Sequence, residues 1–134
     1  MTTFDVMSVT MPFLLEGLWM TIQISLVTII SGSILGFFVG MARTVGGKAV
    51  SMTLGLYIHA LRGTPFLVHL YVIYFVLPAT GIALLQLEAF PAAVIALSLY
   101  TSTYVSEIVR AAIEASGRDH LGLAAPHLLV PEVR

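Results

Sequence analysis

The stretch GLWMTIQISLVTIISGSILGFFVGMA, residues 17–42, decides the fold of this 134-residue chain, because it contains no Asp, Glu, Lys or Arg. As a helix it would be about 39 Å long, which exceeds the roughly 30 Å hydrocarbon core of a bilayer. Two more stretches without these charged residues follow, at residues 63–87 and 89–106. We therefore predict an all-α integral membrane bundle with three transmembrane helices.

The composition also favours a membrane protein. Hydrophobic residues make up 58% of the chain and charged residues only 10%, whereas a soluble domain carries about 25% charged residues. The net charge of −1 provides no basic field for nucleic acid, and the absence of cysteine excludes disulfides and thiol chemistry. Residues 1–16 contain no basic residue, and the apolar run after them is longer than a signal-peptide core, so we predict a permanent span.

The basic residues predict the orientation of the chain in the membrane. Three of them lie between the first and second predicted spans, and three follow the third span. None lies in residues 1–16 or in the link around Glu88. The six are Arg43, Lys48, Arg62, Arg110, Arg118 and Arg134. Because basic loops stay in the cytoplasm, we predict that the N-terminus lies outside and the C-terminus in the cytoplasm.

Small residues recur every three or four positions along the first span, and therefore lie on one helical face. They are Gly17, Thr21, Ser25, Thr28, Gly32, Gly36 and Gly40. Small residues allow another helix to approach closely in lipid. The neighbouring helix would belong either to the same chain or to another subunit.

Several residues mark the ends of the predicted helices. Gly46–Gly47 end the first one, and apolar residues at helical spacing within 50–61 predict a short helix at the cytoplasmic interface. We predict that Thr64 caps the second span and that Pro65 occupies its first helical position. We also predict that Pro78 and Gly81 break the second helix on the far side of the membrane, and that Pro91 starts the third helix.

The third predicted span is unusually rich in hydroxyl groups. Seven residues carry one: Ser98, Tyr100, Thr101, Ser102, Thr103, Tyr104 and Ser106. A lipid-facing helix does not need so many polar side chains, so their neighbours should be other helices or a wet pathway. Glu107, Arg110 and Glu114 then form a charged face where this helix leaves the membrane. That face is either an ion-pair ladder or a functional element.

No catalytic or metal site can be found in the sequence. Gly46-Gly47-Lys48 is not a P-loop, because positions 42 and 49 are both alanine. The four histidines lack metal-ligand spacing, and no nucleophile–base set is present. His69, inside the second span, is either a polar packing residue or part of a pathway. We expect neither a cofactor, a metal nor an enzymatic activity.

Two segments of the chain resemble a known family. YIHALRGTPFLV, residues 57–68, followed by IYFVLP, residues 73–78, resembles the "RGTP" and "YFGLP" segments of ABC-transporter permeases for polar amino acids, of the glutamine and histidine type. The stretch YVSEIVR, residues 104–110, is similar to the next span of that family. The resemblance covers roughly residues 11–115.

The resemblance implies a function and a set of partners. Such permeases form the path of ATP-driven amino acid importers in the bacterial inner membrane, with about five spans. They work as homodimers or with a sister permease, on two ABC ATPase subunits, and receive substrate from an external binding protein. For this chain it implies a structural role for the motif residues Arg62, Gly63, Thr64 and Pro65. Substrate-path candidates are Ser102, Thr103 and Tyr104.

The resemblance stops near Ala115. The family's cytoplasmic "EAA" loop, which docks on the ATPase, is not reproduced in residues 116–126. We therefore divide the chain into a permease part, 1–115, and a divergent cytoplasmic tail, 116–134. A truncated or frameshifted gene would explain the tail, and the product would then not transport alone. The alternative is a small accessory protein that associates with a full-length permease without transporting.

Overall fold

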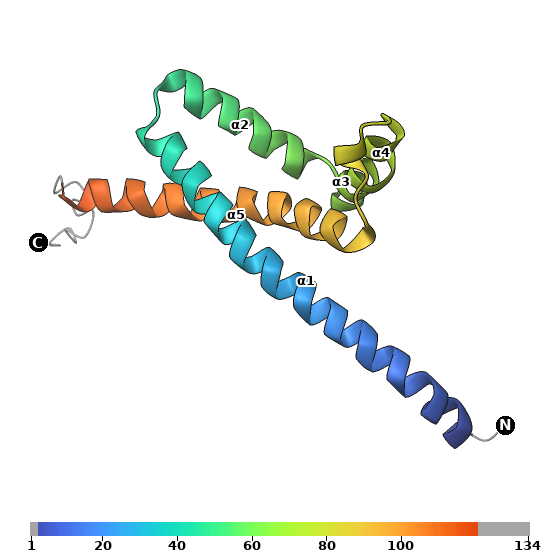
Figure 1. Cartoon of the computed structure of the whole chain (residues 1–134). Coiled ribbons are helices and arrows are strands. Elements are labelled where there is room, and N and C mark those ends of the chain that lie inside the picture. Colours follow the sequence, from blue (N-terminus) through green and yellow to red (C-terminus); the bar gives the residue numbers. More distant parts are fainter. Residues whose placement is uncertain (1–2, 121–134) are drawn as a thin grey trace, which may run out of the picture.

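The computed structural model describes residues 3–120 and is all-helical over that range (Figure 1). Residues 121–134, most of the predicted tail, lie outside the described residues. The elements are α1 (Thr3–Val45), α2 (Lys48–Gly63), α3 (Phe66–Tyr71), the π-helix η1 (Val72–Val76), α4 (Leu77–Ala79), the 3-10 helix η2 (Ala83–Leu85) and α5 (Ala89–His120).

Within residues 3–120, two helices are long and apolar enough to cross a membrane. They are the segments Met7–Val45 of α1 and Ala89–Gly117 of α5. Both extend beyond the predicted first and third spans, because the helices continue past the charged residues at their ends. Large apolar side chains stay exposed on them, for example Phe13 at 70% and Trp19 at 61%, as expected for surfaces that face lipid or another subunit.

The helix of the predicted second span is shorter than the stretch 63–87. Elements α3, η1 and α4 form one helical run over residues 66–79, about 21 Å long at the usual rise. It ends at Ala79, and Gly81 follows with φ +76°, a conformation that glycine adopts without strain. This run meets α2 at an angle of 101°, so α2 and α3–α4 together count as at most one bent span.

The π-helix η1 has a local cause in the sequence. A proline has no backbone N–H, and its ring clashes with the carbonyl four residues earlier, so Pro78 disturbs the turn before it. The N–H of Leu77 bonds instead to the carbonyl of Val72, five residues back. The wider turn keeps the helix continuous up to Ala79.

The prediction that Thr64 caps the second span is wrong. The next helix begins at Phe66, and Pro65 before it has a non-helical backbone with ψ 139°, so the prediction that Pro65 occupies the first helical position is also wrong. The proline also holds Thr64 in an extended conformation, so its hydroxyl points back toward α2. It donates to the carbonyl of Ala60 at 3.1 Å and shares a 2.8 Å hydrogen bond with His69 Nε2.

The small-residue face of α1 packs against α5. A Cβ atom built on Gly32 would lie 2.9 Å from the Cβ of Thr101. One built on Gly36 would lie 2.6 Å from the Cβ of Val105, and one built on Gly40 would lie 2.6 Å from the carbonyl oxygen of Ser106. The partner residues advance along α5 as the glycines advance along α1. The two helices therefore cross with their chains running in the same N-to-C direction (Figure 1).

Packing within the chain is thereby confirmed for the C-terminal half of the small-residue face. The N-terminal half is different, since a Cβ on Gly17 would meet nothing within 4 Å. There the hydroxyls of Thr21 and Ser25 donate to carbonyls of their own helix, at 2.8 Å each. The face is therefore half occupied by α5 and half open.

Candidate functional site

The hydroxyl-rich side of α5 is an interface between helices. Ser102, Thr103 and Ser106 are fully buried. Their hydroxyls donate to carbonyls three residues earlier, at 2.7, 2.7 and 2.9 Å. Ser98 is also buried, and its hydroxyl lies 2.7 Å from that of Ser31 on α1. These hydroxyl groups are satisfied without water, and small side chains let α1 and α2 approach closely.

Helix α2 reaches the same part of α5 with two polar side chains. The Tyr57 hydroxyl lies 3.0 Å from the Ser102 hydroxyl. Arg62 Nη2 donates to the carbonyl of Thr103 at 2.8 Å, and Nε donates to the Thr103 hydroxyl at 3.3 Å. The Arg62 guanidinium carbon also lies 4.3 Å from the centre of the Tyr104 ring, which is a cation–π contact.

Aromatic side chains surround this contact. The hydroxyls of Tyr100 and Tyr104 are 3.1 Å apart, and the ring of Tyr100 packs against Phe66 and His69 of α3. Tyr104 is 45% exposed. We call Arg62, Tyr100, Thr103 and Tyr104 the Arg62 cluster. It is the place where α2, α3 and α5 present polar groups to one another, and its open side is formed by Tyr104 and Arg62.

The structure brings the two predicted sets of residues together. The substrate-path candidates Ser102 and Thr103 are buried under α2, and Tyr104 is exposed beside them. Within the "RGTP" motif, Arg62 contacts α5, whereas a Cβ on Gly63 would meet nothing within 4 Å. The contact between Arg62 and Thr103 could not be predicted from the sequence, because no spacing rule relates positions on separate helices.

The predicted charged face of α5 extends onto α1. Arg110 Nη2 and Nη1 donate to Glu107 at 3.1 Å and Glu114 at 2.5 Å, as the ladder prediction requires. Glu107 also forms an ion pair with Arg43 of α1, whose side chain is only 14% exposed. The Arg43 contact was missed, although the register of Gly40 against Ser106 leads to it. Two cations and two anions here neutralise one another.

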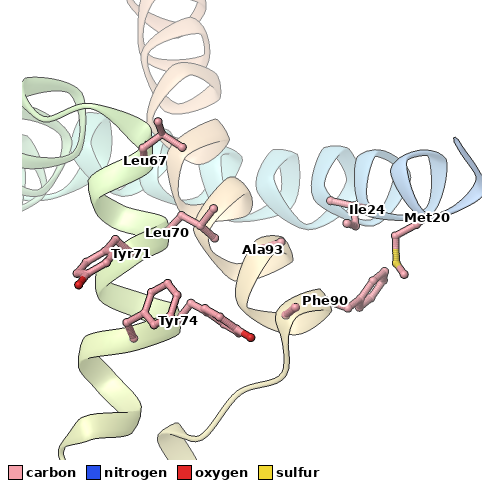
Figure 2. Close-up of a pocket in the computed structure, with 10 residues that line it drawn as sticks. Met20, Ile24, Leu67, Leu70, Tyr71, Tyr74, Phe90 and Ala93 are labelled. Atoms are coloured by element: carbon pink, nitrogen blue, oxygen red, sulfur yellow. The ribbon is translucent and has the colours of Figure 1, made fainter. Parts of the chain in front are cut away.

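A second feature is an apolar groove of about 630 Å³ (Figure 2). Met20 and Ile24 of α1 line one side and residues of α3 and η1 the other, with the start of α5 between them (Figure 2). The lining residues are Met20, Ile24, Leu67, Leu70, Tyr71, Tyr74, Phe75, Ala89, Phe90 and Ala93. None carries a charge, so the groove cannot pair with the charged groups of an amino acid.

These features define a helical membrane protein with a polar seam between its spans. It is similar to permeases from bacterial transport systems. The chain is 38% identical over 102 residues to the L-cystine transport system permease protein TcyB of Bacillus subtilis, and 40% over 104 residues to its arginine permease protein ArtQ. It is 36% identical over 102 residues to the glutamine permease protein GlnP of Escherichia coli K12. These matches cover 76%, 78% and 76% of this chain.

A solved structure shows the same fold. The crystal structure of an amino acid ABC transporter with histidines matches 92% of this chain with a TM-score of 0.76 and 32% identity. No protein-family model matches the chain. The chain belongs to the permeases of amino acid ABC transporters and is an inner-membrane protein. It spans 42%, 47% and 46% of the length of the three curated relatives, and 59% of the solved chain.

Proposed function

We propose that this chain is a membrane-spanning permease subunit of an ATP-driven amino acid importer and forms part of the translocation path. The observation that carries the proposal is the combined match in sequence and fold. Relatives for three chemically different amino acids align with three quarters of the chain, and a solved transporter chain superposes on nine tenths of it.

We propose three membrane crossings in this chain, with the N-terminus outside and the C-terminus in the cytoplasm. Helices α1 and α5 cross at an angle and run in the same N-to-C direction where they pack (Figure 1). Two neighbouring spans that run in the same direction require the chain between them to cross back. Residues 48–88 would make that crossing, and α3–α4 is their most apolar helical run. The positive-inside rule supplies the orientation.

Permeases of this kind need other subunits, and we propose the same for this chain. ATP would be hydrolysed by separate ABC ATPase subunits, and an external binding protein would deliver the amino acid. A second permease, identical or a sister chain, would complete the path. The 39-residue segment Met7–Val45 of α1 is longer than one bilayer crossing requires. Its exposed N-terminal half offers a surface for contacts with these subunits.

Within the chain we propose residues 1–115 as the permease part and 116–134 as a separate tail. The substrate path would run beside the exposed side of the Arg62 cluster, with Tyr104 facing it. Ser102 and Thr103 would support the path from behind, because both are buried and bonded to α2. Gly63, Thr64 and Pro65 would form the sharp bend between α2 and α3.

A reconstitution experiment tests the proposal. The full chain is placed in proteoliposomes with the ATPase subunit and external binding protein from the same genome. Uptake of labelled L-cystine, L-arginine and L-glutamine is measured together with ATP hydrolysis. We expect ATP hydrolysis to be stimulated by one of these substrates only when the chain is supplied together with a second, full-length permease, because the ATPase-docking loop is not reproduced in residues 116–126. Co-purification with a full-length permease without any stimulation would instead show an accessory role.

A further inference from the structure

Arg62, counted above among the cytoplasmic flanks, extends its guanidinium from the end of α2 to a residue within a candidate span. Its partner Thr103 is the central residue of the candidate span Ala89–Gly117. A helix needs about 20 residues to cross the hydrocarbon core, and every stretch of that length within this span contains residues 98–108. Thr103 is therefore at least about five residues, or roughly 7 Å, inside the nearer boundary of the core.

The guanidinium of Arg62 is oriented and only partly used. Thr103 accepts hydrogen bonds from Nε and Nη2, and Tyr104 stacks against the guanidinium face. Because Thr103 is fully buried, water cannot replace it as the anchor. Arginine has five N–H donors, and two are used here. The edge formed by Nη1 and the second Nη2 hydrogen has no hydrogen-bond partner among residues 7–117.

No carboxylate of the described residues neutralises Arg62. The other charges along this part of α5 are balanced, since Arg43 and Arg110 pair with Glu107 and Glu114. Arg62 forms no ion pair over residues 7–117. A charged side chain within a membrane span is costly, and usually faces a partner charge or a water-filled cavity. The described residues therefore hold the Arg62 guanidinium in place without a carboxylate counter-ion, which a bound ligand could supply.

The free edge of Arg62 fits one chemical group well. Two parallel N–H donors bind a carboxylate in a bidentate, charge-assisted manner. The hydroxyls of Tyr100 and Tyr104 lie 3.1 Å apart beside it, and whichever accepts that hydrogen bond keeps its own proton to donate. Every α-amino acid carries a carboxylate, whatever its side chain.

We propose that Arg62, oriented by Thr103 and Tyr104, binds the α-carboxylate of the amino acid as it crosses the membrane; this rests on the proposed function. Arg62 is the binding group and Thr103 is a positioning residue. The site recognises the group that all substrates share, so selection among side chains would fall to other parts of the transporter. A lipid phosphate offers the same oxyanion chemistry, and the experiment must separate the two sources.

Solid-state NMR on the full chain in phosphatidylglycerol-containing bilayers separates these sources. The chain carries ¹⁵N-labelled arginine, and L-arginine, L-glutamine and L-cystine labelled with ¹³C at the carboxylate are added one at a time. A bidentate pair places the carboxylate carbon within about 4 Å of the guanidinium nitrogens. The ¹⁵N–¹³C coupling reports the substrate, and ¹⁵N–³¹P coupling reports a lipid phosphate.

Four variants make the signal specific. We expect Arg62→Lys and Arg62→Gln to abolish the carboxylate coupling, and Arg62→Gln to weaken amino acid binding at least about tenfold. Thr103→Val, which keeps the side-chain shape, should reduce the coupling without abolishing it. Tyr71→Phe, on the apolar groove, is the matched control and should change nothing. Far-UV circular dichroism on every variant verifies that the helices are retained.

Each remaining outcome is informative. A carboxylate that binds saturably but shows no coupling to Arg62 overturns the proposal and leaves the permease function standing. Coupling of Arg62 to ³¹P alone also overturns it, because the counter-ion is then a lipid headgroup. Absence of coupling to all three amino acids overturns it as well. The permease function fails separately, only if the reconstituted wild-type system shows neither uptake nor ATPase stimulation.

Discussion

Replacing Gly36 with alanine should separate α1 from α5. The new Cβ would lie 2.6 Å from Val105 Cβ and 2.8 Å from the carbonyl oxygen of Ser102, whereas ordinary contacts are 3.4–4 Å. The helices must therefore move apart by about 1 Å at the crossing, and overpacking of this kind costs about 1–3 kcal/mol. The backbone carbonyl cannot turn aside as a flexible side chain could.

Gly17→Ala is the matched control for this prediction. A Cβ there meets nothing within 4 Å, yet the gain in helix propensity, up to about 1 kcal/mol, is the same for both substitutions. The difference between the two variants therefore isolates the clash. The free energy of unfolding is measured by titrating SDS into mixed micelles, with fluorophores on cysteines introduced near the C-terminal ends of α1 and α5. Equal changes at positions 36 and 17 would refute the packing argument.

Two other contacts between α1 and α5 give further predictions. The chain has no native cysteine, so Ser31→Cys with Ser98→Cys, whose hydroxyls are 2.7 Å apart, should form a disulfide in high yield under mild oxidation. The pair Ile29→Cys with Ser98→Cys should not, because the Ile29 side chain is 58% exposed. Similar yields for the two pairs would contradict the register. For the Arg43–Glu107 ion pair, a double-mutant cycle with Arg43→Ala and Glu107→Ala should give a coupling energy of about 1 kcal/mol or more. A coupling energy near zero would mean that this pair does not join the helices.

The positions of the long helices were predicted from the sequence more accurately than their lengths. Long stretches without charge identified α1 and α5, because a helix pairs all of its backbone N–H and C=O groups within one apolar segment, as lipid requires. The helical spacing of apolar residues within 50–61 identified α2. The charge-free stretch 63–87 is longer than the helix within it, because absence of charge does not register a helix end. The prediction that Pro78 and Gly81 break this helix is confirmed, since the helix ends at Ala79.

The candidate site was predicted in its parts but not in its assembly. The hydroxyl-rich run and the "RGTP" motif were both recognised as local patterns. Their meeting through Arg62 and Thr103 depends on the angle between α2 and α5, which no local pattern encodes. The same holds for Arg43 and Glu107. The capping role predicted for Thr64 failed because a proline in the next position forces an extended backbone there.

The central claim is that this chain crosses the membrane three times, with α1 and α5 parallel. Single cysteines at the exposed positions Lys48, Gln86 and Gly117 test it most directly, using a membrane-impermeant maleimide on intact cells and on inverted vesicles. We expect Gln86→Cys to be labelled in intact cells, and Lys48→Cys and Gly117→Cys only in inverted vesicles. Labelling of Gln86→Cys and Lys48→Cys from the same side would contradict the account.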